Sequence, residues 1–140
     1  MRKIILTLML LASVAVAEGI HWAKDFDSGI KMAQKENKPV LFVFSRHTCK
    51  YCKILERTTF LDDRVIKQLN KSFVSIIAYS DDGDAMPQEL WRPGTPTIWF
   101  LLPSGQPMYQ PLMGALPADN FLEALGIVKK EFDKSQKRVK

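Results

Sequence analysis

Two cysteines separated by two residues, Cys49 and Cys52, directly follow an apolar run, and this combination limits the fold more than any other stretch of the chain. The run, residues 40–44, is apolar at every position, which is typical of a strand buried on both faces. Residues 53–57 have good helix propensity. A helix that begins near Cys49 would direct free N–H groups and a partial positive charge at its sulfur, favouring the thiolate. We therefore expect a redox site, in which Cys49 attacks and Cys52 resolves the mixed disulfide.

A structural disulfide explains this pair poorly, because a loop with two intervening residues is too small to constrain the unfolded chain much. A second alternative is a metal site formed by His47, Cys49 and Cys52. Zinc usually takes a fourth ligand, and His21, the other histidine, lies near the start of the exported chain. Covalent haem attachment needs a histidine at position 53, which is Lys53. We expect no metal and no cofactor beyond the redox-active Cys49–Cys52 disulfide.

The first 17 residues have the three parts of a secretory signal peptide. Arg2 and Lys3 give a basic start, residues 4–16 are almost all apolar, and the segment ends in an A-x-A pattern at Ala17. The apolar run is shorter than the roughly 20 residues that cross a bilayer. We expect cleavage after Ala17, export, and no stable membrane insertion of the mature chain; the alternative is an uncleaved membrane anchor.

The formal net charge of +5 is concentrated at the two ends of the chain. Residues 129–140 hold six basic and two acidic residues, and the body between the ends is close to neutral. The basic balance therefore does not indicate a nucleic-acid-binding face. A solvated helix end explains the basic tail, and weak attraction to an anionic membrane or an acidic partner is the alternative.

The remaining 123 residues, 18–140, suit one domain, with a core over about 22–129 and a basic helix end over 130–140. Apolar periodicity and turn signals predict four helices and four strands. The helices are expected over 25–37, 49–60, 62–70 and 116–134, and the strands over 40–44, 73–79, 97–102 and 108–113. A right-handed strand–helix–strand crossover and a turn at 103–107 predict a mixed sheet with helices on both faces.

The buried strand, Cys49-Lys50-Tyr51-Cys52 and the later Gly94-Thr95-Pro96-Thr97 together resemble the thioredoxin superfamily. The resemblance implies the α/β thioredoxin fold, with Pro96 in a cis peptide bond facing the cysteines. It also implies that Thr95 presents backbone groups to an extended substrate chain. Lys50 and Tyr51, between the cysteines, would tune the redox potential, and Lys50 and a protonated His47 would lower the pKa of Cys49.

Within the superfamily, the chain resembles exported thioredoxin-like proteins, namely the DsbD C-terminal domain and SoxW-like periplasmic thioredoxins. The matching residues are 38–44, 49–53, 56, 59–60 and 94–100. This resemblance implies a monomeric periplasmic thiol–disulfide oxidoreductase that reduces protein or peptide disulfides. A DsbD-like membrane thiol donor would reduce it again. The alternatives are a disulfide oxidant or isomerase, and a non-catalytic binding or chaperone module.

One position departs from the resemblance. Cytosolic thioredoxins carry a buried aspartate beneath the second cysteine, and the matching residue here is Val43. Glu56, one helical turn beyond Cys52, is a candidate proton relay through a water, and the alternative is an exposed helix residue. Thr48 replaces the aromatic residue that precedes the first cysteine in many thioredoxins, which predicts a more polar rim.

Overall fold

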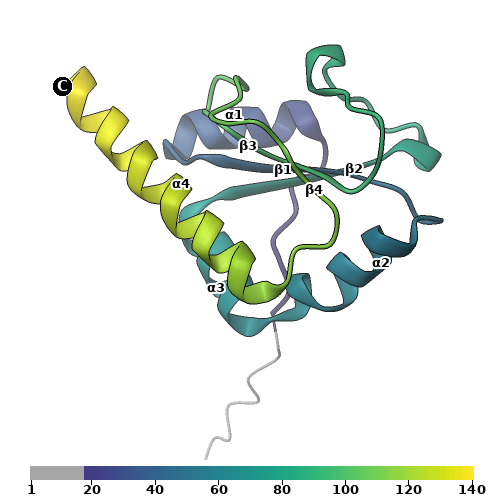
Figure 1. Ribbon diagram of the computed structural model, residues 1–140. Coiled ribbons are helices and arrows are strands. Elements are labelled where there is room, and N and C mark those ends of the chain that lie inside the picture. The colour runs from purple at the N-terminus through teal and green to yellow at the C-terminus, as the bar shows by residue number, and fades with distance from the viewer. Residues whose placement is uncertain (1–17) are drawn as a thin grey trace, which may run out of the picture.

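A four-stranded mixed sheet lies at the centre of the computed structural model, which describes residues 18–140 (Figure 1). The signal peptide expected over residues 1–17 lies outside the described residues. Within the described part, no helix combines the length and the apolar character of a membrane span.

The helices and strands occur in the expected order. The helices are α1 (Phe26–Glu36), α2 (Lys50–Arg57), α3 (Asp63–Ser72) and α4 (Ala118–Val139). The strands are β1 (Val40–Ser45), β2 (Val74–Tyr79), β3 (Thr97–Leu101) and β4 (Leu112–Met113). Short 3-10 helices cover Thr59–Leu61, Ser80–Asp82 and Gln88–Leu90.

The strands are ordered β2-β1-β3-β4, so β1 is central and the cysteines follow the middle of the sheet. β1 and β2 are parallel, joined by the crossover through α2 and α3, whereas β3 is antiparallel to both β1 and β4. The expected mixed sheet is confirmed. All six residues of β1 are buried, as the unbroken apolar run predicted.

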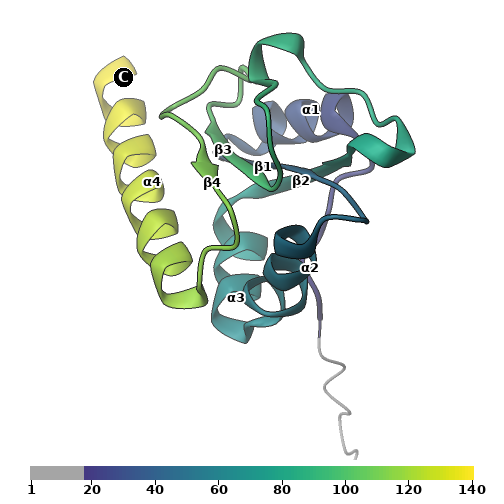
Figure 2. The same ribbon diagram turned by 45° about the vertical axis from the view of Figure 1, so that its right-hand side comes forward.

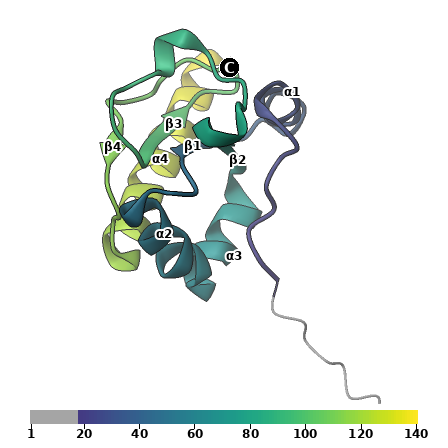
Figure 3. The same ribbon diagram turned by 90° about the vertical axis from the view of Figure 1, so that its right-hand side faces the viewer.

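The alternation of β1 side chains divides the core into two layers. Val40, Phe42 and Phe44 pack on the side of α1, together with Trp99 of β3. Leu41 and Val43 pack on the opposite side, in a cluster with residues of α2, α3 and α4. Figure 3 shows α1 and the α2–α3 pair separated by the sheet.

Gly29 of α1 lies directly against Ile76 of β2. A Cβ atom at this position would lie 2.4 Å from the side chain of Ile76. No real Cβ contact is that short, so a larger residue at position 29 would push α1 away from the sheet.

Three element boundaries differ from the predictions by more than two residues. β4 has two residues instead of six, because Pro107 and Pro111 have no N–H to donate to a ladder. The helix after Cys49 ends at Arg57 and passes through Thr58 into the 3-10 turn. The last helix continues to Val139, beyond its last buried residue, Phe132, and its end projects from the body of the molecule (Figure 2).

Candidate active site

Cys49 is the N-cap residue of α2, as the position of the cysteines after β1 predicted. Its Sγ accepts a hydrogen bond from the backbone N–H of Cys52, with an N···S distance of 3.2 Å. Cys49 is partly exposed, whereas Cys52 is fully buried one turn into the helix. Both cysteines are free thiols in this structure. The partly exposed sulfur of Cys49 is therefore accessible to another molecule, whereas the Cys52 sulfur is accessible only from Cys49, as dithiol–disulfide exchange requires.

The surroundings shift the pKa values of the two thiols in opposite directions. Burial raises the pKa of Cys49, but hydrogen bonds from the side chains of Cys52 and Thr95 and from the backbone at the start of α2 outweigh it, so the net change is downward. Burial, followed by the neighbouring Cys49, raises the pKa of Cys52. Near neutral pH the first sulfur is therefore the more readily ionised of the two.

The segment before β3 brings Thr95 and Pro96 to the cysteines. The Thr95–Pro96 peptide bond is cis, and the Cys49 thiol donates to the carbonyl oxygen of Thr95 over 3.4 Å. Gly94 has a positive φ of 106°, and the Thr97 hydroxyl donates to its carbonyl oxygen over 2.8 Å. The structure thus gathers Cys49, Cys52, Thr95 and Pro96, residues from two distant parts of the chain, at one point.

Trp99 anchors the loop that leads to this segment. Its indole N–H donates to the carbonyl oxygen of Leu90 over 2.9 Å, and the guanidinium of Arg92 lies 4.8 Å from its ring centroid. The side chain is 2% exposed. Core packing is therefore the role of Trp99, and it fixes the approach to Thr95.

Lys50 and Tyr51 are exposed on the first turn of α2. The Lys50 ammonium lies 5.9 Å from the centroid of the Tyr51 ring. Neither side chain hydrogen-bonds to either sulfur atom.

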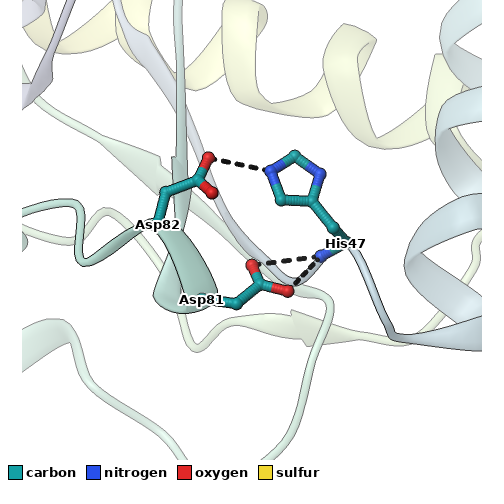
Figure 4. A group of neighbouring side chains, drawn as sticks. All are labelled: His47, Asp81 and Asp82. Carbon is teal, nitrogen blue, oxygen red and sulfur yellow. Dashed lines mark hydrogen bonds and ion pairs between the residues drawn. The ribbon is translucent and has the colours of Figure 1, made fainter.

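His47 forms a polar cluster with the acidic turn after β2 (Figure 4). Its Nε2 lies 2.8 Å from Asp82 Oδ2, and its backbone N–H donates to both carboxylate oxygens of Asp81. Its ring stacks on Tyr79, with centroids 3.9 Å apart. The hydrogen bond to Asp82 raises the pKa of His47, and the positive charge expected to act on Cys49 is instead offset by two carboxylates.

Among residues 18–140, His47, Asp81 and Asp82 are also the one set of three side chains whose ligand-type atoms, one from each, lie within 4.8 Å of one another. All three are exposed, and their mutual hydrogen bonds account for the arrangement. The cysteines are not part of this set, so the structure does not assemble the alternative ligand group of His47, Cys49 and Cys52.

Glu56 is half-buried, and its carboxylate accepts a hydrogen bond from the hydroxyl of Tyr79. Burial and this carboxylate raise the pKa of Tyr79. The sequence reasoning named Glu56 and missed Tyr79, Asp81 and Asp82. The sequence held one signal for these three residues, which is that they end or follow the second predicted strand. Parallel strands β1 and β2 end at the same edge of the sheet, where Ser45 pairs with Tyr79, so the residues after the two strands lie close together.

A family model described as a thioredoxin-like domain matches residues 26–129. A thioredoxin from Thermus thermophilus has 28% sequence identity and a TM-score of 0.66, covering 79% of this chain and 88% of that one. The oxidised C-terminal domain of DsbD from Neisseria meningitidis has 25% identity and a TM-score of 0.56, covering 69% and 87%.

A curated relative, spermatogenesis-associated protein 20 from Rattus norvegicus, is 29% identical over 58 residues. This match covers 41% of the present chain and 7% of the relative. It is therefore a similarity to a small part of a much longer protein.

Proposed function

The chain belongs to the thioredoxin-like family, and from that premise we propose that it is a periplasmic thiol–disulfide oxidoreductase that reduces substrate disulfides through Cys49 and Cys52. The family and the similarity to thioredoxin and to the DsbD C-terminal domain support thiol–disulfide exchange in general. The substrate class, the direction and the compartment are our proposal.

The observation that supports the proposal most is the opposite shift of the two thiol pKa values. A partly exposed sulfur that ionises easily can attack a disulfide brought by a partner. A buried sulfur that keeps its proton stays inactive until the first bond has formed. A pair of equivalent surface thiols would have no such order of events.

The proposed reaction has two exchange steps. The Cys49 thiolate attacks one sulfur of the substrate disulfide, so a mixed disulfide forms and the other substrate sulfur leaves as a thiolate. Cys52 then loses its proton and attacks Cys49 Sγ, which forms the Cys49–Cys52 disulfide and releases the second substrate sulfur. The substrate gains two electrons and two protons, and the protein loses them. Thr95 lines the approach, where its backbone would pair with an extended substrate segment.

The pattern of residues 1–17 supports export to the periplasm, with cleavage after Ala17. Return to the dithiol form needs a thiol donor, and the similarity to a DsbD C-terminal domain supports a DsbD-like membrane protein in that position. We propose a monomer that works without a bound cofactor.

A trapping experiment tests the proposal. The Cys52→Ala variant should accumulate mixed disulfides with periplasmic proteins, because the resolving thiol is gone, and reducing agent should release them. The Cys49→Ala variant is the matched control and should trap none. Absence of covalent partners on Cys52→Ala would favour a non-catalytic binding module.

Direction is tested separately by equilibrating the purified protein with glutathione buffers. A potential near the roughly −270 mV of thioredoxin supports a reductase, and one near the roughly −120 mV of strong oxidants would reverse the direction. A reversed direction would leave the two exchange steps intact and exchange the roles of donor and acceptor.

A further inference from the structure

This inference rests on the proposed function. In its second exchange step, Cys52 must become a thiolate inside the protein, where burial disfavours a negative charge. Cys52 is fully buried, and burial raises its pKa. Leu55, one turn after Cys52 on the buried face of α2, and Val43, on the β1 face that α2 covers, are apolar and 1% or less exposed. A buried thiolate without a hydrogen-bond donor is unfavourable, so resolution would be slow unless the surroundings supply one.

Ser45 is the last residue of β1 and is 1% exposed. Alternation along the strand places it on the same face as Leu41 and Val43, the face that α2 covers. In the described part of the chain, its Oγ is the one buried side-chain nitrogen or oxygen that has no hydrogen-bond partner. Buried hydroxyl groups are almost always paired, so an unpaired one at this position calls for a role.

We propose that the Ser45 hydroxyl donates a hydrogen bond to the Cys52 thiolate as this sulfur attacks the mixed disulfide. In the resting protein Cys52 is a neutral thiol, which is a weak acceptor, and the hydroxyl has no partner. When Cys52 ionises, the proton passes through solvent to the departing substrate sulfur, and the hydroxyl rotates to the new negative charge. The Ser45 side chain acts to lower the pKa of Cys52, against the larger effect of burial.

Among the side chains that lower the pKa of Cys52, Thr95 has the larger effect but acts on both cysteines, whereas Ser45 acts on Cys52. Glu56 is acidic and offers no positive charge, and the Tyr79 hydroxyl already donates its hydrogen bond to the Glu56 carboxylate. Thr95 favours the thiolate of both cysteines, and the Arg46 backbone also acts on Cys52. Ser45 has no such effect among the main influences on Cys49, so it should assist the second step without assisting the first.

The test separates the two steps with 5,5′-dithiobis(2-nitrobenzoate), a small aromatic disulfide. Attack by Cys49 releases one coloured thiolate, and resolution by Cys52 releases the second. In Ser45→Ala, the first phase should keep the wild-type rate, and the second should be about tenfold slower, as expected for losing one hydrogen bond to a charged group. Ser75→Ala, a serine 2% exposed on the same sheet face opposite Leu41, should change neither phase.

Two further measurements exclude a merely structural role. In a Cys49→Ala background, Ser45→Ala should raise the pKa of Cys52, followed by thiolate absorbance. The midpoint of urea unfolding should stay the same or rise, because an unpaired buried hydroxyl has been removed.

The outcomes are distinguishable. A wild-type protein that releases no thiolate overturns the proposed function itself. A wild-type protein with two phases, together with a Ser45→Ala variant whose second phase is unchanged or whose phases slow equally, overturns the role of Ser45 alone.

Discussion

Cys49 and Cys52 are three residues apart, yet they lie in two different environments. The site rim, formed by Cys49, Thr95 and the backbone at the start of α2, is partly exposed and supplies several hydrogen bonds to its sulfur. The site floor, formed by Cys52, Ser45, Val43 and Leu55, is buried and mostly apolar. At the rim, the Cys52 and Thr95 side chains stabilise the thiolate first, and the backbone N–H groups at the start of α2, which a helix provides whatever its sequence, add to them. The environment of the floor sulfur depends on individual side chains, so a single substitution can change it more easily.

Removing the rim sulfur should have the largest effect. Cys49→Ala should reduce insulin reduction by dithiothreitol to the uncatalysed background, because Cys52 is buried and cannot meet a protein disulfide. The fold should be retained, as judged by circular dichroism. Catalysis that persists in this variant would show that the floor sulfur reaches substrate directly, and the distinction between rim and floor would fail.

Weakening the packing of the floor should lower stability more than activity. Leu55 is fully buried on the inner face of α2, so Leu55→Ala should cost about 2–5 kcal/mol of unfolding free energy, measured by urea denaturation. Ile54→Ala, the neighbouring residue at 39% exposure, is the matched control and should change stability by about 0.5 kcal/mol or less. Equal losses in both variants would contradict the burial described here.

The pH dependence of alkylation should separate the two sulfurs. In Cys52→Ala, iodoacetamide should modify Cys49 with a midpoint below the ordinary thiol value of 9.0, because hydrogen bonds stabilise its thiolate. In Cys49→Ala, the midpoint for Cys52 should lie above 9.0, because burial disfavours its thiolate. Removing one cysteine also removes its influence on the other, so the two midpoints should be closer than in the intact pair. Midpoints in the reverse order would falsify the proposed order of attack.

The smallest effect is expected for the hydrogen bond between His47 and Asp82, which lies outside the rim and the floor. The pKa of His47 is raised above 6.5, so the pair stabilises the folded protein below pH 6.5, and this contribution is lost as pH rises through the folded-state pKa. Asp82→Asn should lower the His47 pKa, measured by proton NMR of the imidazole ring. Asp84→Asn, in the same turn, is the control and should leave it nearly unchanged. A His47 that titrates identically in Asp82→Asn would show that the hydrogen bond is absent in solution.

Local sequence signals and the resemblance to thioredoxins predicted the rim better than the floor. The thioredoxin fold that the resemblance implied is confirmed. A wholly apolar strand, a helix after Cys49 and a turn-rich loop before β3 are local signals, so the sequence alone could indicate them. Asp62 as the start of α3 is a local signal of the same kind and is confirmed by its hydrogen bond to the Arg64 N–H. The short β4 was the weakest prediction, although Pro107 and Pro111 already excluded a regular ladder.

Contacts between distant parts of the chain could not be predicted in the same way. Val43 showed that a carboxylate was missing from the floor, but the burial of Ser45 beside Cys52 depends on how α2 packs on β1. Tyr79 and Asp82 reach His47 only because β1 and β2 are parallel and in register. Such pairs join residues more than thirty positions apart, and no local pattern in the sequence links them.

The overhanging end of α4 offers a practical use. Beyond Phe132 its residues no longer belong to the core, and Val139 is 86% exposed, while α2, which begins after Cys49, lies on the opposite side of the molecule in Figure 1. A dye, an affinity handle or a solid support joined there should leave the chemistry undisturbed. Immobilised protein could then serve as bait for the disulfide-bearing molecules that it meets in a cell extract.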